Sequence, residues 1–109
     1  MKLRVQDSAV NVRKLITNLY DDYNIINNSQ VDHDTYFIVI ERYFFRTGNR
    51  ASLSIVISSE DEFRSIIEAV GSGGGQGMIF KFDWGVKESF EGRIPTHLQQ
   101  HNIPFERIN

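Results

Sequence analysis

The sequence predicts an α+β fold, in which an antiparallel sheet of about five strands has two helices packed on one face. Near the N-terminus, apolar residues recur every three or four positions, which indicates an amphipathic helix. The middle of the chain is rich in β-branched and aromatic residues, which favour strands. Short connections that contain Gly, Asn or Asp separate these stretches, as is typical of antiparallel pairing.

A short strand and the first helix open the chain. Residues 1–6 alternate loosely between apolar and polar side chains and predict the strand. Asp7 or Ser8 can cap the following helix, because either side chain can accept a bond from an unpaired backbone N–H. One apolar stripe then runs along the helix, formed by Ala9, Val12, Ile16, Leu19 and Tyr23.

Residues 24–57 predict three strands. The first, residues 24–31, is polar and rich in Asn, and it is the weakest pattern. Residues 35–45 and 51–57 have strong strand patterns, and Thr47-Gly48-Asn49 supplies a turn between them. These two strands therefore predict a hairpin that forms the centre of the sheet.

Residues 58–70 fit two structures. Ser59 and Glu62 have the spacing of a capping box, and the apolar residues that follow suit a short helix. The alternative is a turn at Ser58–Asp61 followed by a strand at Phe63–Val70.

Residues 78–83 then alternate as in a strand. Val86, Phe90 and Ile94 recur at helical spacing, and a short helix from Pro95 to His101 is expected, since proline is favoured at a helix start. Residues 103–108 predict a last strand, which Pro104 places at a sheet edge.

Composition limits the classes of function. The 109 residues predict a single domain over 1–109. The absence of cysteine excludes disulfides, thiolate zinc sites and a thiol nucleophile. A formal net charge of -2 gives no general attraction to nucleic acid or to anionic membranes, so neither is an expected partner. No apolar run approaches the roughly 20 residues of a membrane helix, and residues 1–6 do not resemble an export signal, so a cytoplasmic location is expected.

Two sequence blocks are similar to those of a known family. The first block is Glu41-Arg42-Tyr43, Gly48-Asn49-Arg50 and Ser52-Leu53-Ser54, and the second is Ala69, Gly71-Ser72-Gly73-Gly74, Gln76, Met78, Phe80-Lys81, Gly85 and Phe90. Over residues 36–92 the chain resembles a family of small bacterial proteins known only as a domain of unknown function. The resemblance favours a strand at residues 63–70. It implies no activity, substrate or cofactor, and residues from about Pro95 onward look like an extension.

The two matched blocks contain most of the candidate binding residues. Binding candidates are charged, amide or aromatic side chains in or near the matched blocks: Arg42, Arg50, Gln76, Lys81 and Trp84. One hypothesis is that Asn49 and Arg50 form the hairpin tip and contact the loop around Gln76. Arg42, Phe44 and Arg46 share one side of their strand, a pattern that can bind single-stranded nucleic acid. A structural role in ion pairs or ring stacking is favoured for them, because the net charge is acidic.

Three further motifs have a catalytic or ligand-binding interpretation. His97 and His101 share a helix face and can both bind a metal, but no third ligand accompanies them, so a solvated face is favoured. Asp32-His33-Asp34 holds an acid–base pair, although a hairpin turn is the better interpretation. The glycines of residues 71–77 precede a strand and lack the Lys-Ser/Thr of a phosphate loop. This favours a bend or bulge where another backbone or a ring passes close, or simply a mobile loop.

The sequence therefore favours a non-catalytic domain that binds a protein or a second copy of itself. Aromatic residues exceed what one thin core requires, and no acid, base and nucleophile converge in the sequence. The alternative is a small-molecule binder with a pocket between sheet and helices, where Arg42 or Lys81 is the polar anchor. An enzyme is the least supported class, and no cofactor is expected.

Overall fold

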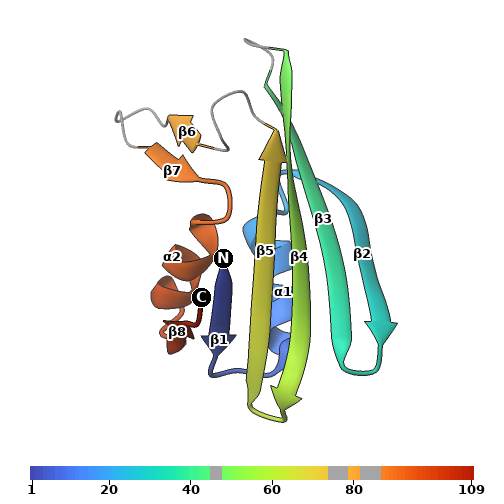
Figure 1. Cartoon of the computed structure of the whole chain (residues 1–109), viewed down its shortest axis with the longest axis vertical. Helices are drawn as coiled ribbons and strands as arrows, with labels where there is room; N and C mark the ends of the chain where they lie inside the picture. Colours follow the sequence, from blue (N-terminus) through green and yellow to red (C-terminus); the bar gives the residue numbers. More distant parts are fainter. Residues whose placement is uncertain (45–47, 74–78, 82–86) are drawn as a thin grey trace.

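The computed structural model describes residues 1–44, 48–73, 79–81 and 87–109, and within these ranges it shows an α+β fold (Figure 1). Six of the described strands form one antiparallel sheet, the main sheet, in the order β2-β3-β4-β5-β1-β8. Their bounds are β1 Lys2–Val5, β2 Asn24–Asp32, β3 Thr35–Phe44, β4 Asn49–Asp61, β5 Arg64–Gly73 and β8 Phe105–Arg107. The predicted antiparallel sheet is confirmed, with six described strands where about five were expected. The expected last strand is β8, which lies at the edge of the sheet beside β1.

A second pair of strands lies apart from the main sheet. Here β6, Ile79–Lys81, pairs antiparallel with β7, Lys87–Ser89. The expected strand at residues 78–83 is thus present over its central residues, and its ends lie outside the described ranges. The helical spacing that includes Val86 and Phe90 is misleading, because residues 87–89 are extended.

Helix α1, Ala9–Leu19, begins as the sequence predicts. The Ser8 hydroxyl accepts a hydrogen bond from the Asn11 backbone N–H at 3.2 Å, so Ser8 is the cap. The helix ends earlier than its apolar stripe, which continues to Tyr23. Asp21 and Asp22 follow the helix end, and aspartate competes with helical hydrogen bonds, so this segment turns back toward the sheet.

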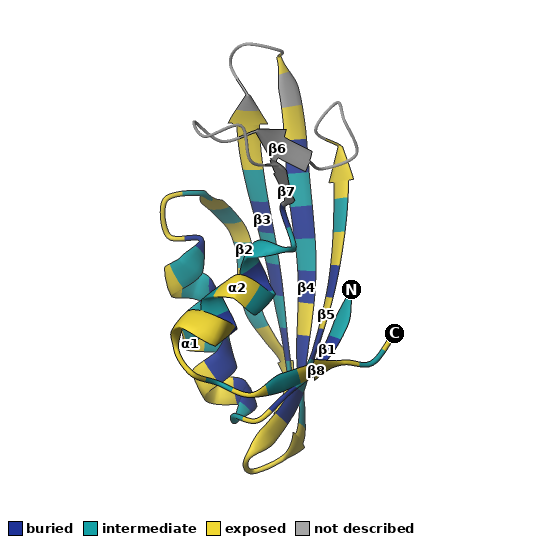
Figure 2. Cartoon of the chain, turned by 90° about the vertical axis from the view of Figure 1, so that its left-hand side faces the viewer, coloured by how far each residue is buried: buried dark blue, intermediate teal, exposed yellow. Residues whose placement is uncertain are grey.

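Helix α2, Arg93–Gln100, begins two residues before the expected Pro95. Pro95 occupies its first turn, where a missing N–H removes no intrahelical bond. Neither helix of the described residues has the length and apolar character needed to cross a bilayer. α1 and α2 lie on the same face of the main sheet (Figures 1 and 2), as the sequence predicts.

Residues 64–73 form a strand, so the helix suggested by the capping-box spacing is wrong and the strand favoured by the family resemblance is confirmed. The predicted turn at Ser58–Asp61 is also displaced. β4 continues to Asp61, and the chain turns at Glu62 and Phe63. Ser65, Ile67 and Ala69 are buried while their neighbours point outward, which is the period-2 alternation of a strand.

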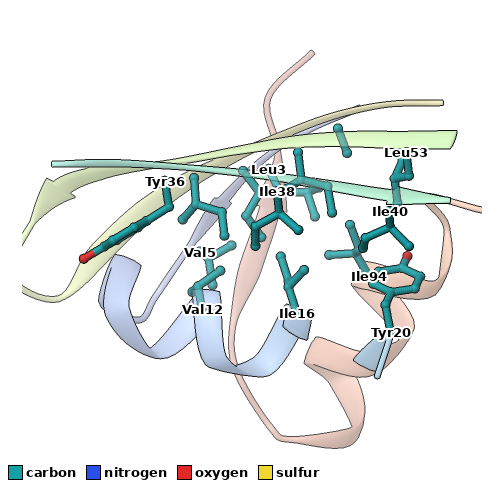
Figure 3. Packing of buried hydrophobic residues seen from close by; sticks show 14 of the residues in the cluster. Leu3, Val5, Val12, Ile16, Tyr20, Tyr36, Ile38, Ile40, Leu53 and Ile94 are labelled. Carbon is teal, nitrogen blue, oxygen red and sulfur yellow. The ribbon is translucent and has the colours of Figure 1, made fainter. Parts of the chain in front are cut away.

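The core lies between the main sheet and the helices (Figure 3). Alternate residues of β3 and β4 supply its sheet side: Tyr36, Ile38, Ile40, Leu53, Ile55 and Ile57. Val12 and Ile16 of α1 and Ile94 of α2 pack against them. Burying one such side chain contributes roughly 1.5–3 kcal/mol, which makes this layer the main source of stability.

Candidate functional site

Two arginines and three aromatic residues meet where the C-terminal end of α1 approaches β3 and α2. We call this group the tyrosine–arginine cluster: Tyr20, Tyr23, Arg42, Phe90 and Arg93. Arg42 donates a hydrogen bond from Nη1 to the Tyr23 hydroxyl at 2.7 Å, and Arg93 donates to the same oxygen at 2.6 Å. One phenol oxygen therefore accepts bonds from two cations.

Ring contacts fix the cluster. The Tyr20, Tyr23 and Phe90 rings pack with centroids 5.3–5.6 Å apart. Tyr20 is fully buried and donates its hydroxyl hydrogen to the Phe90 carbonyl at 2.8 Å. The Arg93 guanidinium lies 5.2 Å from the Tyr23 ring centroid and 5.5 Å from that of Tyr20. The cluster thus holds positive charge at a set position beside a hydroxyl group.

Arg50, the second arginine candidate, lies on the other face of the sheet. Arg42 is opposite Ala51 in the β3–β4 register, and Arg50 precedes Ala51. Because successive strand residues point to opposite faces, Arg50 points away from the cluster. It pairs with Glu41 at 3.4 Å and lies over the Tyr43 ring at 6.0 Å. The structure therefore separates Arg42 from Arg50.

The remaining binding candidates fall in or near the gaps of the structure. Gln76 and Trp84 lie outside the described residues, as does Arg46. The backbone of Lys81 is the last residue of β6 and is opposite Lys87 in β7. The predicted contact between Arg50 and the loop around Gln76 stays a prediction.

His97 and His101 share a face of α2, as their spacing predicts. Their ring centroids are 4.4 Å apart, and His97 Nε2 is shielded from solvent without a hydrogen-bond partner among the described residues. Burial lowers the pKa of His97, and the nearby His101 and Arg93 lower it further. No group of three metal-ligating side chains occurs in the part of the chain that the structure describes.

Asp32-His33-Asp34 forms the turn between β2 and β3, so the structural interpretation is confirmed. The Asp34 backbone N–H donates to Asp32 Oδ1 at 2.8 Å, and this bond lowers the Asp32 pKa. The His33 side chain is 90% exposed. These groups stabilise a turn in open solvent, which does not favour proton transfer to a bound substrate.

The glycine segment meets a neighbouring backbone at Gly73. This residue has φ +80°, and a Cβ there would collide with the Arg50 carbonyl oxygen. The close approach of another backbone is therefore confirmed at Gly73, the last residue of β5, whereas residues 74–77 lie outside the described residues.

The sheet face opposite α1 and α2, which we call the outer face, carries an unexpected apolar surface. Figure 1 looks onto this face, with α1 behind the strands. Phe37 and Val56 are directly opposite one another, and Val70 and Val56 are 60% and 38% exposed. With Val39 and Ile66 they form the apolar strip: Phe37, Val39, Val56, Ile66 and Val70.

A shallow hollow of about 410 Å³ lies beside the apolar strip. Val56 and Ile66 line its apolar part, and its charged lining residues are Lys2, Arg4, Glu60 and Glu68. Arg4 bridges Glu60 at 2.9 Å and Glu106 at 2.8 Å. Charges of both signs therefore border one apolar surface.

Sequence reasoning missed two parts of these surfaces. The sequence patterns do not single out Arg93, and they place Tyr23 only in the helix stripe. Tyr23 and Arg93 are 70 residues apart in sequence, so no local pattern joins them. The outer-face valines and Ile66 were visible as apolar residues, but their face depended on the strand register.

Comparison with known protein families places the chain in a family. A family model described as a family of unknown function (DUF6054) matches residues 3–102. This range includes residues 95–102, so the expectation that an extension begins at about Pro95 is wrong for them. No curated protein and no solved structure matches the chain.

Proposed function

Because the chain belongs to DUF6054, a family of unknown function, we propose its function from its own surface: it is a single non-catalytic domain that pairs with a second copy through the outer face. One observation carries this proposal. The apolar strip lies on the central strands of a sheet face that neither α1 nor α2 covers.

The charges beside the strip favour a second copy as the partner. In a two-fold dimer a residue away from the symmetry axis meets a different residue of the other protomer, so an interface with charges of both signs can be complementary to itself. Lys2 and Glu68 are opposite one another in the β1–β5 register and border the same hollow. A rotated copy can place Lys2 of one protomer near Glu68 of its partner.

Analytical ultracentrifugation over a range of protein concentrations tests this function. We expect the wild-type chain to dimerise and Val70→Lys to weaken the dimer by about tenfold or more, because the lysine places a charge in the apolar strip. Val10→Lys is the matched control, since Val10 is an exposed valine (50%) in α1, on the other side of the main sheet from the strip. Circular dichroism checks that each variant folds.

A monomeric wild-type chain at the highest concentration contradicts the proposal. Equal dimerisation of wild type and Val70→Lys contradicts the assignment of the interface to the outer face.

A second candidate function, binding of a small molecule, is supported by a different observation. Arg42 and Tyr23 line a hollow of about 280 Å³ at the edge of the main sheet. Core side chains fill the space between the main sheet and the helices (Figure 3), where a pocket was expected from the sequence. The hollow at the sheet edge is therefore the better place for a ligand anchored by Arg42.

A further inference from the structure

Four side chains form a row across the strands of the outer face, beginning in the apolar strip. Val56 in β4 is directly opposite Glu68 in β5, and Glu68 is directly opposite Lys2 in β1. Ile108 donates its backbone N–H to the Lys2 carbonyl, so it lies on the other side of Lys2. All four residues line the same shallow hollow. This cross-strand row therefore has an apolar, an acidic, a basic and an apolar side chain, in that order.

The two charges of the cross-strand row have no ion-pair partner. Lys2 and Glu68 are neighbours across β1 and β5, but no ion pair joins them to one another or to another described residue. Arg4, the other cation of the hollow, already bridges Glu60 at 2.9 Å and Glu106 at 2.8 Å. One cation and one carboxylate of the hollow are therefore left for a partner.

These two charges favour a second copy over a partner with one kind of charge. An acidic partner would be repelled by Glu68 and a basic partner by Lys2, whereas a second copy brings both charges in the same row. Two sheets that pack face to face keep their strands nearly aligned. A two-fold axis that runs parallel to β1 and β5, between them, therefore lays one cross-strand row over the other in reverse order.

We infer that the outer-face dimer is held in register by two equivalent ion pairs, each between Lys2 of one protomer and Glu68 of its partner. The same rotation lays Val56 of one protomer over the partner's Ile108. Each charge then meets its opposite, and each apolar end of the row meets an apolar end. This inference rests on the proposed function and adds the register in which the two copies meet.

Charge reversal, measured by analytical ultracentrifugation, tests this register. Lys2→Glu and Glu68→Lys each turn both ion pairs between protomers into like-charge pairs, so each variant alone should weaken the dimer by about tenfold or more. In an equal mixture of the two variants, one chain carries two carboxylates in the row and the other carries two ammonium groups. The mixed dimer should therefore form with a dissociation constant within about threefold of the wild-type value.

The mixture separates pairing between protomers from effects within one chain. Each chain of the mixture still has like charges opposite one another in its own β1–β5 register, so recovery can come only from contact between the chains. Lys14→Glu and Glu62→Lys are the matched controls, because they make the same changes of charge at exposed residues in α1 and at the β4–β5 turn. Each control should dimerise like the wild type.

The outcomes separate the inference from the function on which it rests. A monomeric wild-type chain overturns both. If the wild type dimerises and Lys2→Glu weakens the dimer no more than Lys14→Glu does, the register is wrong and the proposed function stands. If both reversed variants weaken the dimer but their mixture does not recover it, the two side chains border the interface without pairing, and the inference is again overturned.

Discussion

Ala51 separates the surroundings of Arg42 from those of Arg50. Ala51 is 1% exposed and faces the helices, so its register partner Arg42 points to the same side and reaches Tyr23. Arg50 is the next residue along β4 and points to the outer face, where it meets Glu41. At the scale of single residues, the chemistry available to an arginine here depends on which face of the sheet it occupies.

His97 provides a test at the same scale. Burial and the nearby His101 and Arg93 hold its pKa below the ordinary value of 6.5 in the folded chain. Unfolded His97 therefore takes up a proton at a higher pH than folded His97, and this group stabilises the fold above about pH 6.5. The stabilisation is lost as the pH falls below that value toward the lowered pKa of the folded state.

Urea unfolding at about pH 7.5 and about pH 5.5 measures this effect. We expect the free energy of unfolding of the wild-type chain to fall between these pH values, and that of His97→Gln to fall less. His33→Gln is the control, because the His33 side chain is 90% exposed at a turn, and it should follow the wild type. An identical fall in His97→Gln and wild type would contradict the assignment to His97.

At the scale of elements, strand β5 shows that apolar residues on both faces of a strand weaken the alternation of apolar and polar residues in its sequence. Ser65, Ile67 and Ala69 face the core, and the outward residues between and after them include Ile66 and Val70. Because apolar residues occur on both faces, alternation is weak in the sequence and the spacing also fits a helix. Pairing with β4 and β1 on either side makes the segment a strand.

The end of β5 gives a prediction for this scale. Gly73 and Gly48 both have positive φ, at +80° and +69°, but only at Gly73 would a Cβ collide with a neighbouring backbone atom. Gly48→Ala should cost about 1–2 kcal/mol, the cost of placing an L-residue in the left-handed region. Gly73→Ala should cost more, because the Arg50 carbonyl must also move.

Urea unfolding of both glycine variants measures this difference. Equal losses of stability in the two would show that the β4–β5 backbones are not as close at Gly73 as the structure has them.

At the scale of the whole molecule, the two faces of the main sheet have different roles. β3, β4 and β5 are each paired on both edges, whereas β2 and β8 are edge strands of the main sheet. The helices pack on one face of these central strands, and the apolar strip lies on the other. The core layer and the proposed interface therefore share the same strands.

Native-state amide hydrogen exchange tests this organisation. We expect the slowest exchange at amides of Ile38, Ile55 and Ile67, since these residues are fully buried in the central strands. Amides of β8 should exchange faster, because β8 has three residues and one neighbour in the sheet. If residues 36–57 exchanged as fast as β8, the central hairpin would not be the most stable part of the fold.

Local patterns in the sequence determined much of the fold. The α1 stripe, the Ser8 cap and the β3–β4 hairpin could be predicted, because each depends on residues close together in the chain. The turn at Asp32-His33-Asp34 and the edge position of the strand after Pro104 follow for the same reason.

The tertiary structure alone decided how distant segments meet. The strand at residues 64–73, the tyrosine–arginine cluster and the separation of Arg42 from Arg50 all depend on strand order and register. Tyr23 and Arg93 contact one another because the segment after α1 lies beside the start of α2, although the two residues are 70 positions apart. Periodicity reports the faces of one element, whereas these contacts depend on how several elements pack, and that packing minimises the free energy of the whole chain.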